Sequence, residues 1–88
     1  MTILIADDDK SICTSAAMML EDAGFETEQV YSARDAVLRV SRGGINLALI
    51  DMNFCQDTTS GKEGLELLSA LKEEDSSLPI VLMTGWER

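Results

Sequence analysis

Three short apolar runs and one more polar run alternate along the chain with segments in which apolar residues recur every three or four positions. Continuous apolar runs are typical of strands buried on both faces, and the longer spacing is typical of helices with one buried side. The pattern predicts the order βαβαβαβ. Strands are expected at residues 2–6, 26–31, 47–50 and 80–83, and helices at residues 11–23, between Ser32 and Gly43, and at 61–74.

The predicted helices carry start and stop signals. Gly24 supplies a left-handed stop for the first helix, Ser32 caps the second with Asp35 as its capping-box partner, and Gly43-Gly44 ends it. The residues at helical spacing are expected to face the core. They are Ile12, Ala16, Met19, Leu20 and Ala23 in the first helix, Ala33, Ala36, Val37 and Val40 in the second, and Leu65, Leu68 and Leu71 in the third.

Alternating strands and helices predict a three-layer α/β/α fold with one parallel sheet, because right-handed crossovers place helices on both faces. The polar strand at 26–31 suits a sheet edge, so the expected strand order is 2-1-3-4. The direction of winding then reverses between the first and third strands. Ligands of such sheets bind beyond the carboxyl ends of the strands at this point.

Composition narrows the possible functions. The chain has 88 residues, enough for one domain, and a net charge of −9 that argues against binding nucleic acid phosphates, although acidity alone also serves solubility. No apolar run approaches the roughly 20 residues that span a membrane. Cys13 and Cys55 are far apart and there is no histidine, so a zinc site is not expected. Cys13 is expected to pack on a helix, and the setting to be a reducing cytoplasm.

Two acidic clusters follow the predicted buried strands. Ile3-Leu4-Ile5-Ala6 leads into Asp7-Asp8-Asp9, and Leu47-Ala48-Leu49-Ile50 leads into Asp51. In a parallel sheet these carboxylates meet at one edge, where they repel one another and raise their proton affinity unless a hard divalent cation binds among them. The pattern therefore predicts a Mg²⁺ site.

The same chemistry divides the roles. Asp51, alone at its strand end, is the candidate nucleophile toward phosphorus, and Asp7 and Asp8 are the candidate metal ligands. Simpler interpretations stay open. The triplet can form a turn and a helix cap, which is the expected role of Asp9, and Asp51 or Thr84 can merely end a strand.

Four motifs together resemble the receiver domain of two-component response regulators, with its flavodoxin-like (CheY-like) fold. The closest type is the nitrogen-regulator type, in which the receiver precedes an ATPase that acts on the alternative sigma factor sigma-54. The motifs are Ile3-Leu4-Ile5-Ala6-Asp7-Asp8-Asp9, Leu49-Ile50-Asp51-Met52-Asn53, Gly64-Leu65-Glu66-Leu67-Leu68 and Pro79-Ile80-Val81-Leu82-Met83-Thr84-Gly85.

The resemblance implies a role for each matching residue. Asp51 would accept a phosphoryl group from a sensor histidine kinase. Asp8 would bind Mg²⁺ directly, Asp7 mainly through water, and Asn53 through its backbone carbonyl. Thr84 would hydrogen-bond a phosphoryl oxygen and move its loop inward on activation. The implied protein is a phosphorelay module that controls transcription through domains outside this chain, with no separate turnover substrate.

The chain departs from the family in two places. The loop after Asp51 is longer, with an insertion within residues 56–62, and Phe54-Cys55 stands where the family has Met-Pro. Residues 1–88 correspond to a partial receiver that stops after the fourth strand, so the family's phosphoryl-pairing lysine and aromatic switch residue have no counterpart. We therefore expect the chain either to be a fragment of a longer protein or to self-associate through the strand at 80–83 or the helix at 11–23.

Two alternatives to signalling stay open. The first is a truncated, non-signalling dimerisation or interaction module. The second is a phosphohydrolase of the haloacid-dehalogenase kind, which places its nucleophile in an Asp-x-Asp motif after the first strand, as Asp7-x-Asp9 formally does. Turnover of a phosphate ester would favour the second alternative.

Overall fold

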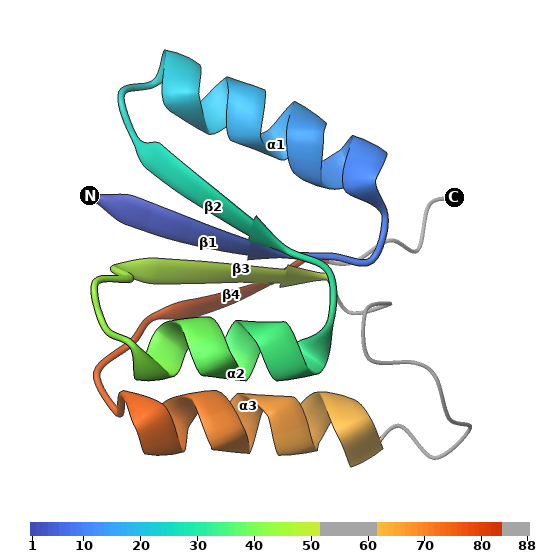
Figure 1. Cartoon of the computed structure of the whole chain (residues 1–88), viewed down its shortest axis with the longest axis vertical. Helices are drawn as coiled ribbons and strands as arrows, with labels where there is room; N and C mark the ends of the chain where they lie inside the picture. The colour runs from blue at the N-terminus through green and yellow to red at the C-terminus, as the bar shows by residue number, and fades with distance from the viewer. Residues whose placement is uncertain (52–61, 84–88) are drawn as a thin grey trace.

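The fold is a four-stranded parallel sheet between two layers of helices (Figure 1). The computed structural model describes residues 1–51 and 62–83, with side chains described for 1–51 and 67–82. Its elements are β1 (Thr2–Ala6), α1 (Lys10–Asp22), β2 (Glu26–Val30), α2 (Ala33–Ser41), β3 (Leu47–Asp51), α3 (Lys62–Glu74) and β4 (Ile80–Met83). Each agrees with its predicted element to within one or two residues.

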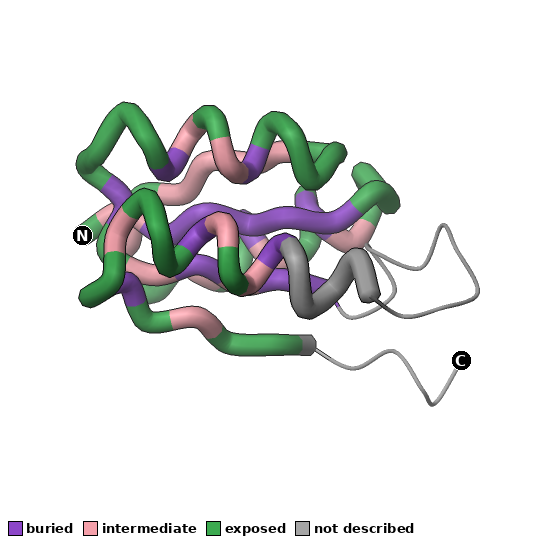
Figure 2. The backbone as a smooth tube through the Cα atoms, turned by 90° about the horizontal axis from the view of Figure 1, so that it is seen from below, coloured by how far each residue is buried: buried purple, intermediate pink, exposed green. Residues whose placement is uncertain are grey.

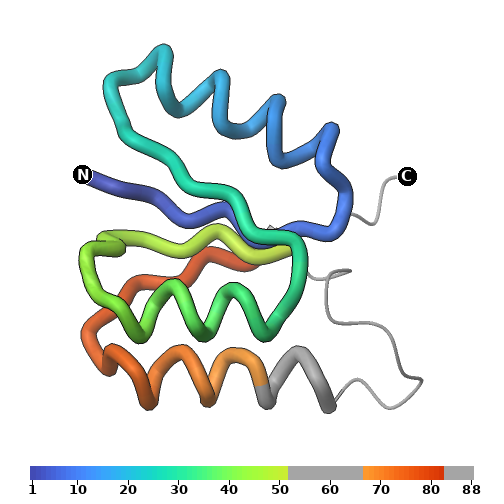
Figure 3. The backbone as a smooth tube through the Cα atoms, in the orientation of Figure 1, coloured from blue at the N-terminus to red at the C-terminus, as the bar shows by residue number. Residues whose placement is uncertain are grey.

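The strand order is β2-β1-β3-β4, with every neighbouring pair parallel, as predicted. The trace in Figure 3 passes from each strand to the next through one helix. The more polar β2 lies at an edge, and the buried β1 and β3 lie in the middle of the sheet. Figure 2 shows this burial, with buried backbone in the central layer and exposed residues along the outer sides of the helices.

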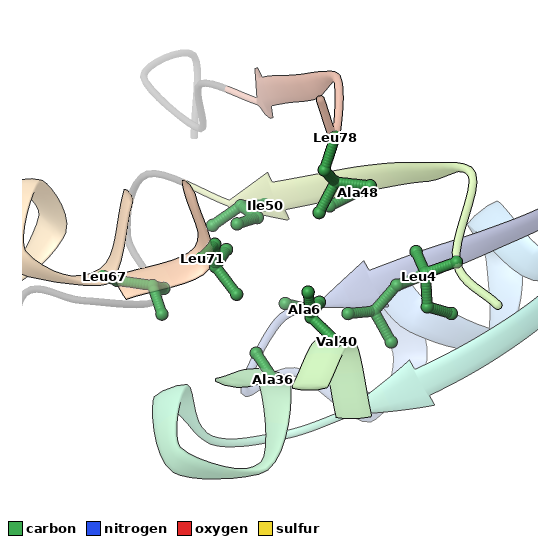
Figure 4. Close-up of a cluster of buried hydrophobic side chains, with 10 residues drawn as sticks. Leu4, Ala6, Ala36, Val40, Ala48, Ile50, Leu67, Leu71 and Leu78 are labelled. Carbon is green, nitrogen blue, oxygen red and sulfur yellow. The ribbon is translucent and has the colours of Figure 1, made fainter. Parts of the chain in front are cut away.

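The two faces of β1 contribute to different cores, because successive side chains of a strand point to opposite sides. Leu4 and Ala6 pack with α2 and α3, whereas Ile3 and Ile5 pack with α1. Figure 4 shows the larger cluster, in which side chains from both helices meet those of the sheet. Its members are Leu4, Ala6, Ala36, Val40, Ile45, Ala48, Ile50, Leu67, Leu71 and Leu78.

The inward side of α1 agrees with the prediction only in part, since the predicted Ala16 and Leu20 are partly buried against the smaller cluster. Cys13 and Ala17 are buried, whereas Met19 is 73% exposed and Ala23 is also exposed. A helix turns about 100° per residue, so Met19 lies roughly 200° from Ala17 and on the opposite side. In α2 the predicted Ala36 and Val40 are buried, but Ala33 is exposed in the first turn, before the helix meets the sheet.

The predicted helix ends are confirmed. Gly24 has a φ of +98°, a conformation that residues with a Cβ rarely adopt, and it follows the C-cap residue Ala23 of α1. The Ser32 side chain accepts a hydrogen bond from the backbone N–H of Asp35 (3.1 Å) at the start of α2. Among the described residues, none of the helices has the length and apolar character needed to cross a membrane.

Candidate functional site

Two buried carboxyl groups lie at the carboxyl edge of the sheet. Ala6 pairs with Ile50 in the parallel ladder between β1 and β3, so Asp7 and Asp51, one residue further on, lie at adjacent strand ends. The arrowheads of β1 and β3 in Figure 1 point to this edge. Asp7 is 1% exposed and Asp51 is 4% exposed. Acidic residues are seldom this buried, so the pair is expected to have a function beyond packing.

Asp7 is held by three different parts of the chain. Its backbone N–H donates to the carbonyl of Val30 (3.2 Å), its Oδ1 accepts from the N–H of Asp9 (3.0 Å), and its carbonyl accepts from the thiol of Cys13 (3.4 Å). The other carboxylate oxygen, Oδ2, is buried and has no hydrogen-bond partner within the described part of the chain. Asp7 therefore offers one oxygen atom in a fixed place.

The surroundings of Asp7 disfavour its charge. The pKa of Asp7 is raised from the ordinary value of 3.8 to about 6, chiefly by burial, with the Asp9 N–H lowering it and the neighbouring Asp51 and Asp8 carboxylates raising it. When Asp7 and Asp51 are both ionised, neither carboxylate can donate a hydrogen bond to the other. Their contact is then repulsive, and a cation would relieve it.

The three consecutive acids have three different environments. Asp7 is buried, and Asp8 is exposed. Asp9 caps α1, because its Oδ1 accepts from the N–H groups of Ser11 (2.9 Å) and Ile12 (3.4 Å). The expected capping role of Asp9 is confirmed.

The predicted cluster of three carboxylates is only partly formed. Within residues 1–51 and 67–82, no group of three His, Cys, Asp or Glu side chains is arranged to hold a metal ion. Two buried carboxyl groups and one oxygen without a partner nevertheless fit a hard cation such as Mg²⁺. Mg²⁺ binds through one or two carboxylates and keeps several waters.

Two predicted site residues lie outside the described part of the chain. They are Asn53, predicted to offer its backbone carbonyl, and Thr84, predicted to contact the phosphoryl group. The same holds for Phe54-Cys55 and for residues 56–61 of the segment 56–62 that was predicted to hold the insertion. Their roles stay predictions.

The sequence pattern missed one partner of the site. Cys13 was expected only to pack on α1, and it is indeed fully buried, but its thiol also donates to the Asp7 carbonyl. Its position four residues after the cap residue Asp9 was the available signal, because it places Cys13 one helical turn above the end of β1.

The fold and the site define the chain as a parallel α/β domain with two buried acids at adjacent strand ends. Within this class the chain belongs to the response regulator receiver domain family, whose match covers residues 3–88. Receiver domains are the signalling modules of two-component phosphorelays and accept phosphoryl groups from sensor histidine kinases. This membership decides against the phosphohydrolase alternative.

Individual relatives agree with this assignment. The swarming motility regulation protein RssB of Serratia marcescens is 32% identical over 88 residues, which are 100% of this chain and 38% of RssB. The nitrogen assimilation regulatory protein NtrX of Azorhizobium caulinodans is 34% identical over 83 residues, which are 94% of this chain and 18% of NtrX. The chain thus spans less than half the length of these relatives.

Solved structures show the same fold. A CheY-like response regulator receiver domain protein from Methanospirillum hungatei is 32% identical and superimposes with a TM-score of 0.82. The match covers 96% of this chain and 63% of that one. The predicted fold class is therefore confirmed.

Proposed function

We propose that Asp51 accepts a phosphoryl group from a sensor histidine kinase in a reaction that depends on Mg²⁺. The observation that carries the proposal is the buried pair of Asp7 and Asp51 at adjacent strand ends, with Asp7 Oδ2 lacking a partner among the described residues. A strand-end turn residue would have no reason to be this buried beside a second carboxyl group.

The chemistry is an in-line displacement at phosphorus. A carboxylate oxygen of Asp51 forms a bond to phosphorus while the bond from phosphorus to the donor group breaks, which leaves an acyl phosphate on Asp51. Asp7 and Asp51 would hold Mg²⁺ with Asp8 and the backbone carbonyl of Asn53, and Thr84 would contact a phosphoryl oxygen. The bound cation would offset the negative charge that two carboxylates present to an incoming phosphoryl group.

The output of the signal is a separate inference. We infer a transcriptional output of the nitrogen-regulator, sigma-54-dependent type, carried by domains outside residues 1–88, in the cytoplasm. The 34% identity with NtrX supports this type. The net charge of −9 supports a segment that does not itself bind nucleic acid.

A second candidate function is association with another copy of the chain, with or without signalling. Exposed apolar side chains support it at both predicted surfaces, namely Val81 and Leu82 on β4 and Met18 and Met19 on α1. Sedimentation of the purified chain with and without phosphodonor tests it. A monomer at all concentrations in both conditions would exclude this function.

The decisive experiment for phosphorylation uses acetyl phosphate as a small donor. With Mg²⁺, the intact mass of the chain is expected to rise by one phosphoryl group, and the adduct should resist acid and be lost in base. Asp51→Asn should abolish the adduct, and so should removal of Mg²⁺. The matched control is Asp22→Asn, which removes an exposed aspartate at the far end of α1 and should leave the adduct unchanged.

An adduct that survives Asp51→Asn would overturn the assignment of the acceptor. An adduct that forms equally well in chelator would overturn the dependence on Mg²⁺.

A further inference from the structure

Cys13 lies where α1 meets the end of β1. It is 0% exposed and packs in the smaller core with Ile3, Ile5 and Ala17. Its backbone N–H donates to the carbonyl of the cap residue Asp9 (3.1 Å), so Cys13 belongs to the first turn that the cap organises. The side chain is therefore fixed by packing on one side and by the helix on the other.

The thiol of Cys13 donates to the backbone carbonyl of Asp7 (3.4 Å), in a buried contact. With the bonds from Asp7 N–H to Val30 and from Asp9 N–H to Asp7 Oδ1, the contact occupies three of the four polar atoms of Asp7. Only Oδ2 has no partner in the part of the chain that the structure describes. Such an arrangement fixes both the backbone and the carboxyl plane of Asp7 before any ligand arrives.

We propose that Cys13 is a positioning residue for the cation site, holding Asp7 so that its Oδ2 is presented to Mg²⁺ or to a water bound to Mg²⁺. This inference rests on the proposed function. Preorganised ligands bind a cation more tightly because less conformational freedom is lost on binding. A donor six residues away, on a different element, thereby contributes to affinity without touching the cation.

The chemistry of the thiol is consistent with a permanent donor. The pKa of Cys13 is raised to about 11, chiefly by burial and also by the neighbouring carboxylates of Asp7, Asp9 and Asp8. The S–H group therefore stays protonated at neutral pH. A reactive, thiolate-based role for Cys13 is correspondingly disfavoured.

The test compares two variants that differ by a single hydroxyl group. Cys13→Ser keeps a donor near the Asp7 carbonyl, and Cys13→Ala removes it. If Cys13 positions Asp7, Cys13→Ser should bind Mg²⁺ within about 2-fold of the unmodified chain. Cys13→Ala should bind about 2- to 10-fold more weakly, which is the loss expected for one hydrogen bond. Affinities are measured by isothermal titration with Mg²⁺ on the full 88-residue chain.

If Cys13 only packs, Cys13→Ser should be the less stable of the two variants and should bind Mg²⁺ no more tightly than Cys13→Ala. The reason is that burying a hydroxyl in an apolar cluster costs more free energy than burying a methyl group. Equal or weaker Mg²⁺ binding by Cys13→Ser than by Cys13→Ala would therefore overturn the inference. Ala17→Gly is the matched control, since Ala17 lies one turn further along α1 in the same cluster. It should lower stability with no change in Mg²⁺ affinity, and a loss of affinity equal to that of Cys13→Ala would also overturn the inference.

Failure of the inference is distinguishable from failure of the proposed function. If the unmodified chain shows no Mg²⁺ binding, the proposed function itself fails. If it binds Mg²⁺ but the two substitutions at Cys13 do not differ, only the positioning role fails. Cys13→Val, which lacks the donor but preserves volume better, replaces Cys13→Ala if the latter does not fold, with the same expected loss.

Discussion

The two faces of the sheet are unequally covered. Among the described residues, α2 and α3 contact each other on one face and share a cluster of ten buried residues with the strands. On the other face the buried cluster has four members, of which α1 contributes Cys13 and Ala17, with Ala16 and Leu20 of α1 packed against it as partly buried residues. Figure 1 shows α1 alone on its side of the sheet. Most of the apolar burial that stabilises the fold therefore lies on the α2–α3 face.

The site depends on the more thinly packed face. Asp9 and Cys13, which hold Asp7, both belong to the start of α1, and the third contact comes from Val30 at the end of the edge strand β2. The α2–α3 face therefore supplies most of the buried surface that stabilises the sheet. The geometry of Asp7 is set on the α1 face, which buries less. Binding of a cation should consequently order and stabilise the α1 side.

The largest expected effect tests the α2–α3 face. Leu71 is fully buried in the larger cluster, and Leu71→Ala removes its contacts and leaves a cavity. We expect a loss of about 3–5 kcal/mol in the free energy of unfolding, measured by urea denaturation, which leaves a domain of this size largely unfolded. Leu38→Ala, the same change at an exposed position of α2, is the control and should cost no more than about 0.5 kcal/mol. Similar losses in both variants would contradict the assignment of stability to burial in the larger cluster.

The next effect concerns charge at the site. Because burial raises the pKa of Asp7 from 3.8 to about 6, the folded state binds its proton more tightly than the unfolded state does. The contribution of Asp7 to stability is therefore largest below about pH 4, falls as the pH rises to about 6, and stays low above it. In chelator at pH 7, the free energy of unfolding of Asp7→Asn should be about 2–3 kcal/mol higher than that of the unmodified chain. This difference should vanish near pH 4.

Mg²⁺ provides the counter-test for Asp7. Adding Mg²⁺ should stabilise the unmodified chain and leave Asp7→Asn nearly unchanged, which reverses or reduces the difference between them. A stability of Asp7→Asn that depends on pH between 4 and 6 as strongly as that of the unmodified chain would show that another group carries the titration.

The strand order and the meeting of Asp7 with Asp51 could be predicted from the sequence, because both follow from local rules. Buried parallel strands are read from continuous apolar runs, and parallel neighbours necessarily bring their carboxyl ends to one edge. The capping role of Asp9 was equally predictable, since it depends only on residues within one turn.

The buried side of α1 could not be predicted, because it depends on the angle at which the helix packs on the sheet and the spacing of apolar residues does not determine that angle. Met19 satisfies helical spacing with Ile12 and Ala16 but lies outside the buried side, whose centre passes through Cys13 and Ala17. Asp8 was predicted beside Asp7, and it does act on the pKa of Asp7, but the pattern did not show that Asp8 is exposed while Asp7 is buried. The thiol contact with the Asp7 carbonyl joins two specific atoms, and spacing predicts only that the residues are near each other.

The smallest effect tests whether the cap of α1 matters to the site as well as to the helix. Asp9→Ala removes the acceptor for the N–H groups of Ser11 and Ile12 and should cost about 1 kcal/mol in urea denaturation. Asp9→Ser should restore most of this, because a serine hydroxyl also accepts at the N-cap. Met19→Ser changes only the exposed side of α1 and should stay within about 0.5 kcal/mol of the unmodified chain.

Since the α1 face sets the geometry of Asp7, Mg²⁺ affinity should fall in Asp9→Ala and stay unchanged in Met19→Ser. Equal affinities in all three variants would mean that the site is held by β1 and β3 alone.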